Sequence, residues 1–182
     1  MYPTKTKIND EIYNLNTDFR IALRCYRIVD DSTISDSERA LAIIYLIFGF
    51  IPKENQEEYL SKAKKFLEGP YEFKNNDKER DLDFEQDKKY ILASFYSEYK
   101  IDLEIIEYMH FWKFLDFIAG LSENTILYRV RALRNIDLND IKDDKKRAEI
   151  AQAQYNFAIK EEKTLEEIEA DKLWEEQTKG SD

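Results

Sequence analysis

Apolar residues recur at helical spacing along the first half of the chain, in three segments separated by polar turns. The segments cover residues 17–29, 35–48 and 55–67, and each gathers its apolar side chains on one helical face. Gly49 and Gly69 follow the second and third segments, as glycines that end helices do. The start signals are Thr17 or Asp18 for the first segment, the capping box of Ser35 and Glu38 for the second, and Asn55 with Glu58 for the third. The pattern predicts three helices.

The second half of the chain repeats the pattern in three further segments. We predict helices over residues 86–99, 102–119 and 122–133, the last two each capped by their first residue. The helix over 102–119 has apolar residues on almost every side, which is typical of a central, buried helix. Residues 70–86 are dense in charge and lack helical periodicity, so we interpret them as a mobile surface loop.

The two ends of the chain differ from its helical centre. Residues 4–15 form short alternating runs around a turn-prone Asn-Asp pair and predict a small β-hairpin. A long charged helix over about 144–162 has two weak apolar faces, of which one would pack on the domain and the other would meet a partner. We therefore expect a mainly α protein. Its single multi-helix domain covers residues 1–141 and begins with the hairpin, and a partly frayed, charged helical extension covers 142–182.

Composition narrows the class of protein. The 182 residues suit one domain, and a content of 4 glycines and 3 prolines argues against a turn-rich β fold. A net charge of -10 opposes binding to nucleic acid or to an anionic membrane. The single cysteine, Cys25, provides no internal disulfide and fits a reducing compartment. The longest apolar run, residues 40–51, is too short to cross a bilayer, so we expect no membrane span. Residues 1–10 lack the apolar region of a secretion signal, and together with the single cysteine this favours a cytoplasmic protein.

Residues 84–121 hold a dense block of aromatic residues and the only histidine, His110. Glu107 and His110 form an E-x-x-H pair, which on a helix places a carboxylate and an imidazole on one face, as in half of a di-iron site. Since the chain has no second histidine, only a dimer would complete such a site, and a core or capping role for His110 is favoured. Cys25 and His110 are far apart in sequence, and no glycine loop for phosphate is present. We expect no catalytic residue, no metal and no cofactor.

Five short motifs occur in a fixed order along the chain: Thr17-Asp18-Phe19-Arg20, Phe84-Glu85-Gln86-Asp87, Ile101-Asp102-Leu103, Met109-His110-x-Trp112-Lys113-Phe114 and Gly120-Leu121. This order resembles the bacteriophage "gene product fifteen" family, encoded in long-tailed phages and prophages of Gram-positive bacteria. The resemblance covers nearly all of the chain. Lys100 stands where a glycine is usual in this family, and Phe111 replaces the first of a customary Trp pair. The residues that we interpret as its structural core signature are Phe95, Met109, His110, Trp112, Phe114 and Gly120.

Members of this family resemble tail assembly chaperones, because their genes lie between those of the major tail protein and the tape measure protein. The resemblance implies a non-enzymatic phage tail assembly chaperone of the host bacterial cytoplasm, which keeps the tape measure protein soluble until the tail tube polymerises around it. The major tail protein and a second copy of this chain are further candidate partners. Two alternatives stay open: a structural tail protein retained in the virion and, less favoured, a metal-dependent helical enzyme built on Glu107 and His110. The residues expected to contact a partner are Ile150, Ala153, Phe157, Leu165, Ile168 and Trp174.

Overall fold

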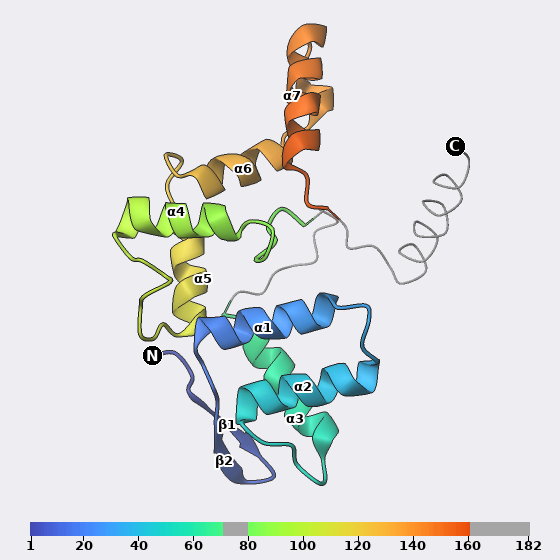
Figure 1. Ribbon diagram of the computed structural model, residues 1–182, viewed down its shortest axis with the longest axis vertical. Coiled ribbons are helices and arrows are strands. Elements are labelled where there is room, and N and C mark those ends of the chain that lie inside the picture. Colours follow the sequence, from blue (N-terminus) through green and yellow to red (C-terminus); the bar gives the residue numbers. More distant parts are fainter. Residues whose placement is uncertain (71–79, 161–182) are drawn as a thin grey trace, which may run out of the picture.

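The structure is a computed structural model that describes residues 1–70 and 80–160. Within these residues the protein is mainly α-helical with a small hairpin at its N-terminus, which confirms the predicted fold class (Figure 1). The helices are α1 (Phe19–Asp30), α2 (Asp36–Phe48), α3 (Gln56–Leu67), α4 (Lys88–Tyr99), α5 (Phe111–Ala119), α6 (Ile126–Arg134) and α7 (Asp144–Phe157), with a 3-10 turn at Leu138–Asp140. In Figure 1 the hairpin and α1 to α3 lie at one end, α4 to α6 lie above them, and α7 projects away from α6.

The predicted hairpin is confirmed. Its antiparallel strands are β1 (Lys5–Ile8) and β2 (Glu11–Asn14). Asn9 and Asp10 join them with φ angles of 46° and 68°, as the two-residue turns that suit the twist of a hairpin require. The rings that fasten the hairpin to α2 and α3 are Tyr13, Phe48, Phe50 and Tyr59, with centroids 5.1–6.5 Å apart.

The helix starts follow the sequence signals in two of the first three cases. The Asp18 carboxylate caps α1, whereas Thr17 is buried beside it and bonds elsewhere. Ser35 and Glu38 form the predicted capping box of α2. Asn55 is the N-cap residue of α3, but it has a φ of 59° and its side chain makes no capping hydrogen bond, so the capping interaction predicted there is wrong.

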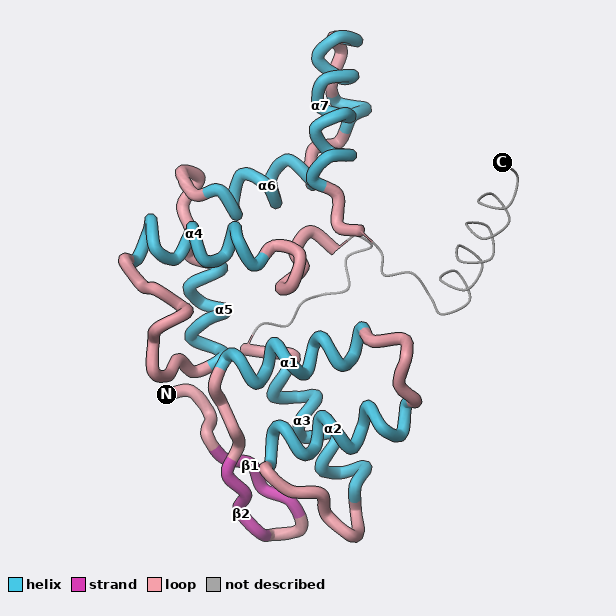
Figure 2. The backbone as a smooth tube through the Cα atoms, viewed as in Figure 1, coloured by secondary structure: helices cyan, strands magenta, loops and turns pink. Residues whose placement is uncertain are grey.

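The largest difference from expectation lies between α4 and α5. The predicted helix over residues 102–119 is wrong in its first half, which follows an irregular path through turns, and α5 begins only at Phe111 (Figure 2). The backbone here pairs with the start of α1 instead. The amide of Phe19 donates to the carbonyl of Met109 at 2.9 Å, and the amide of Phe111 donates to the carbonyl of Thr17 at 2.8 Å. Backbone groups that a distant segment uses cannot also close helical turns.

Two further boundaries differ because side chains have other partners. Thr125 caps α6 in place of the predicted Ser122, whose hydroxyl donates to the carboxylate of Glu98 at 2.8 Å. The helix that we expected to run to residue 162 ends at Phe157, and residues 158–160 are not helical.

One cluster of buried residues extends from Ile8 in the hairpin to Leu127 in α6, with α5 at its centre. The ring of Phe114 stacks on Phe19 at 4.9 Å and on Phe95 at 5.3 Å between centroids. Each large apolar side chain buried in this way contributes about 1.5–3 kcal/mol. Within the core signature, Phe95, Met109, His110 and Phe114 are buried, Trp112 is half-buried, and Gly120 is the exposed C-cap of α5.

Candidate binding groove

The segment from Arg80 to Asp87 leads into α4 and was expected to belong to a surface loop. Of the predicted loop over 70–86, residues 71–79 lie outside the described residues, and the described remainder differs from that expectation because it is fastened to the domain. Asp83 and Asp87 are buried, with 8% and 0% of their surface exposed. The Asp83 carboxylate accepts hydrogen bonds from the backbone amides of Glu85 at 2.9 Å and Gln86 at 2.8 Å, and so shapes a tight turn before α4.

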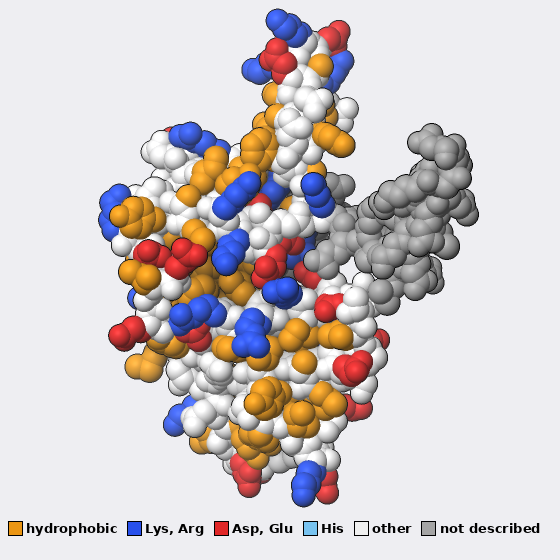
Figure 3. Space-filling view, viewed as in Figure 1, with side chains coloured by type: hydrophobic (Ala, Val, Ile, Leu, Met, Phe, Trp, Pro, Cys, Tyr) orange, Lys and Arg blue, Asp and Glu red, His pale blue; other side chains and the backbone are white. Residues whose placement is uncertain are grey.

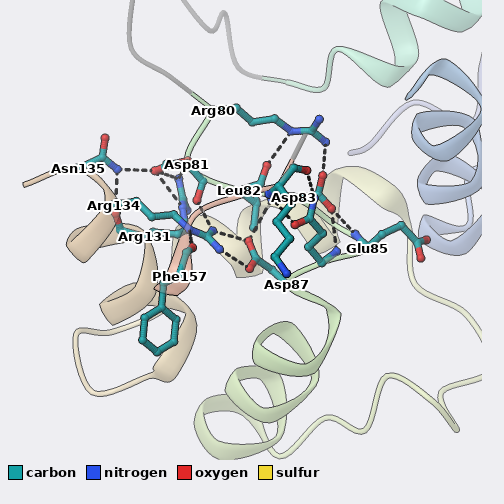
Figure 4. Close-up of polar contacts among 12 residues, drawn as sticks. Arg80, Asp81, Leu82, Asp83, Glu85, Asp87, Arg131, Arg134, Asn135 and Phe157 are labelled. Carbon is teal, nitrogen blue, oxygen red and sulfur yellow. Dashed lines mark hydrogen bonds and ion pairs between the residues drawn. The ribbon is translucent and has the colours of Figure 1, made fainter. Parts of the chain in front are cut away.

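Two arginines of α6 hold this segment in place. Arg134 donates to both carboxylate oxygens of Asp87, at 2.6 and 2.8 Å, and to the carbonyl oxygens of Asp81 at 2.8 Å and Phe157 at 2.7 Å. Arg131 forms an ion pair with Asp81 at 3.1 Å. Figure 4 shows both guanidinium groups pointing toward the aspartates. The network therefore joins α6, the entry to α4 and the end of α7.

The fastened segment forms one wall of an open apolar groove, which we call the α1–α5 groove. Val29 at the end of α1 is 49% exposed there, and the opposite wall is the C-terminal half of α5. The groove has a volume of about 650 Å³, within the range of ligand pockets. The apolar lining residues are Tyr26, Val29, Leu82, Phe84, Leu115, Ile118 and Ala119.

The charged rim of the groove is already paired within the chain. Arg80 lies 3.2 Å from Asp30 and 3.1 Å from Asp83, and the Arg131–Asp81 pair lies on the same rim. An apolar lining with a satisfied polar rim is suited to the apolar face of a helix, which binds by burial while the rim sets its register. The geometry supports protein binding at this groove.

A family model decides the relationship of the chain to known proteins. The model for the bacteriophage Gp15 protein matches residues 2–159. The chain belongs to this family. The resemblance of the sequence motifs is thereby confirmed, and this member of the Gp15 family is a bacteriophage protein. Neither the curated proteins nor the solved structures provide a significant match.

His110, the only histidine of this Gp15-family chain, is the N-cap residue of α5. Its Nδ1 accepts a hydrogen bond from the backbone amide of Trp112 at 3.0 Å, so Nε2 carries the proton and donates to the carbonyl of Pro3 at 2.9 Å. Glu107 lies before α5 begins, so the pair does not share a helical face. Among residues 1–70 and 80–160, no group of three or more metal-binding side chains occurs. The di-iron interpretation loses its geometric basis.

The residues that the sequence analysis assigned to partner binding are only partly described. Ile150, Ala153 and Phe157 are half-buried, and the ring of Phe157 lies 6.3 Å from that of Tyr90 in α4. The opposite face of α7 is more open, with Tyr155 80% exposed. The structure therefore uses part of the predicted partner face within the chain, and a role in binding stays a prediction. The other three assigned residues, Leu165, Ile168 and Trp174, lie outside the described residues.

The α1–α5 groove was not predicted from the sequence. Its apolar residues come from three separate segments, and each segment alone is indistinguishable from a helix or turn that contributes to the core. The one available signal was the two aspartates Asp83 and Asp87, spaced four residues apart in a segment otherwise interpreted as solvated.

In the part of the chain that the structure describes, no helix is long and apolar enough to span a membrane.

Proposed function

We propose that this Gp15-family protein is a tail assembly chaperone. It binds the tape measure protein in the cytoplasm of the host and keeps it soluble until the tail tube polymerises around it. The observation that supports the proposal is the α1–α5 groove, an apolar groove with a volume of about 650 Å³ on a helical phage protein. The role is non-enzymatic, and the His110 geometry, in which both ring nitrogens are engaged within the chain, fits that role.

The expected occupant is an amphipathic helix of the tape measure protein. An apolar face with anchors at i, i+3, i+4 and i+7 would lie along Val29 and Leu115, where water now contacts apolar side chains. Rim pairs such as Arg80–Asp30 are solvent-accessible, with side chains 46% and 39% exposed, and contribute little affinity. Binding therefore depends on burial in the groove more than on charge.

Co-expression with the cognate tape measure protein tests the proposal. The chain should raise the soluble fraction of the tape measure protein several-fold, and Val29→Asp should abolish most of this effect by placing a charge against the bound helix. Ile105→Asp is the matched control, because Ile105 is 79% exposed and lies outside the groove. Circular dichroism must show that both variants are folded. Equal tape measure solubility with and without the chain would refute the proposal. Equal losses of solubilisation in the two variants would place the binding site outside the α1–α5 groove.

A structural tail protein is the alternative that this experiment leaves to a second measurement. Mass spectrometry of purified phage particles distinguishes the two roles, because a chaperone leaves the tail on assembly and a structural component stays. Detection of the chain in particles at the copy number of a tail protein would replace the chaperone proposal. The major tail protein is the expected competitor that displaces the chain from its client.

A further inference from the structure

A second apolar groove lies between α1 and α4, and we call it the α1–α4 groove. Figure 3 shows apolar side chains recessed between these two helices, with Lys and Arg side chains around them. The groove has a volume of about 350 Å³. Its apolar lining residues are Phe19, Leu23, Phe84, Ile91, Leu92, Leu103 and Phe114. The floor, Phe114, is buried, but Leu23 and Leu92 are only half-buried, so the groove can bury more apolar surface.

The rim of the α1–α4 groove favours an acidic occupant. Arg24 and Lys88 are exposed, and neither forms an ion pair with any of the described residues. Arg20 also lines the groove but is held by Asp18, and two carboxylates, Glu85 and Glu104, line it as well. Both α1 and α4 begin at this groove, but each has an aspartate at its N-cap, Asp18 and Asp87. The helix N-termini therefore add little positive charge, and the attraction for an acidic occupant rests on Arg24 and Lys88.

The described chain ends beside this groove. The backbone amide of Lys160 donates to the side-chain oxygen of Gln86 at 2.8 Å, and the side-chain nitrogen of Gln86 donates to the carbonyl of Lys160 at 2.7 Å. Gln86 follows Glu85, which lines the α1–α4 groove, whereas Gln86 and Lys160 themselves line a neighbouring cavity. Five residues of extended chain span up to about 17 Å. The part of α4 that lines the groove, Lys88 to Leu92, rises about 6 Å, so Leu165 can reach this part of the groove.

The sequence beyond residue 160 matches the groove in chemistry. Residues 161–182 contain nine acidic residues and three lysines, so the segment is strongly negative. Leu165, Ile168, Leu173 and Trp174 are interspersed among these charges. A segment tethered at the edge of its site has an effective concentration in the millimolar range, so even weak contacts keep it bound.

We propose that residues 161–182 dock in the α1–α4 groove of their own chain, with apolar side chains between α1 and α4 and carboxylates near Arg24 and Lys88. The docked segment covers apolar side chains on both surfaces that would otherwise contact water. In this docked state Leu165, Ile168 and Trp174 are covered in the free protein. Under the proposed function, on which this step rests, they reach a client only after the segment leaves the groove.

Paramagnetic broadening in the full-length protein tests the docking. A spin label is attached to Thr178→Cys in the ¹⁵N-labelled chain. Cys25 stays unlabelled at neutral pH, because burial raises the pKa of its thiol to about 12 and no reagent reaches it. We expect strong loss of intensity for the backbone amides of Arg24, Lys88 and Leu92, and none for those of Asn55 and its neighbours at the far end of the molecule.

A matched pair of double variants separates docking from incidental proximity. Arg24→Glu with Lys88→Glu should remove the broadening, and Arg27→Glu with Lys89→Glu, which changes charge equally on the same helices outside the groove, should leave it. Equal broadening in both double variants, or no broadening of the groove amides in the parent, overturns the proposal. When spin-labelled ¹⁴N chain is mixed with ¹⁵N chain that has no spin label, strong broadening of the same groove amides overturns it in favour of docking between copies. The tape measure protein is absent from this experiment, so a negative result would leave the co-expression test of the proposed function unaffected.

Discussion

Replacing Arg134 with methionine removes the cation that joins α6 to the entry of α4. The guanidinium makes four hydrogen bonds, to the two carboxylate oxygens of Asp87 and to two carbonyl oxygens. Only 10% of the Arg134 side chain and 1% of the Asp87 side chain are exposed. Water therefore cannot replace the lost partners, and Asp87 is left as an unpaired buried charge. Removing one partner of such a pair costs about 3–5 kcal/mol, a large part of the total stability of a small domain.

Urea unfolding followed by circular dichroism measures this cost. Arg134→Met should lower the free energy of unfolding by about 3–5 kcal/mol. Arg131→Met is the matched control, because its pair with Asp81 is 33% and 28% exposed and should contribute less than about 1 kcal/mol. Asp87→Asn removes the opposite charge while keeping an oxygen for the amide of Asp83, which donates to it at 3.1 Å. The double variant should lose at least about 1.5 kcal/mol less than the sum of the two single variants.

Two results would refute the reasoning. A loss for Arg134→Met that equals the loss for Arg131→Met would mean that burial does not strengthen the pair. Additive losses in the cycle of Arg134→Met and Asp87→Asn would mean that the two side chains do not interact in solution. The segment before α4 also lines the α1–α5 groove, so a folded variant with a weakened network should lose tape measure solubilisation as well.

Three further predictions concern single residues. Lys100 ends α4 with a φ of 58°, so Lys100→Gly should be about 1 kcal/mol more stable than Lys100→Ala in urea unfolding, and equal stabilities would contradict the left-handed cap. Cys25 should react with a thiol reagent at pH 8 only after denaturant is added, and rapid reaction of the native protein would disprove its burial. The Trp112 indole stacks on Phe66 and donates to its carbonyl at 2.8 Å, so Trp112→Ala should lower stability by about 3 kcal/mol, whereas a folded Trp112→Ala with an unchanged melting curve would show that the ring is dispensable.

The parts of the fold that could be predicted are those whose hydrogen bonds close within a few residues. The hairpin turn at Asn9 and Asp10, the capping box of Ser35 and Glu38, and the end of α2 at Gly49 all belong to this group. The prediction failed at residues 102–110 because the strong apolar pattern there is as compatible with a helix as with a turn-rich segment of the core. Periodicity records which side chains are apolar, and it does not record where the backbone amides find their acceptors.

The candidate site could be predicted even less, because its parts are distant in sequence. The aromatic block was correctly interpreted as core around Phe95 and Phe114, since large apolar side chains are buried wherever the chain brings them. The E-x-x-H pair led to a metal hypothesis only because it was placed on a helix that does not exist. The α1–α5 groove and the network at Asp87 depend on three or more segments. The spacing of Asp83 and Asp87 singles out these two residues, but it does not indicate which arginine will pair with them.

The sequence by itself determined the fold class, the hairpin, most of the helices and the family to which the chain belongs. These properties follow from local propensity, from capping and from the order of short motifs, and each of these depends on residues that are close together in the sequence. Only the tertiary structure decided that α5 starts at Phe111, that Asp87 is buried against Arg134, and that two apolar grooves flank α1. Each of these depends on burial and on partners brought together by folding, because the cost of an unpaired buried group is set by its surroundings in space.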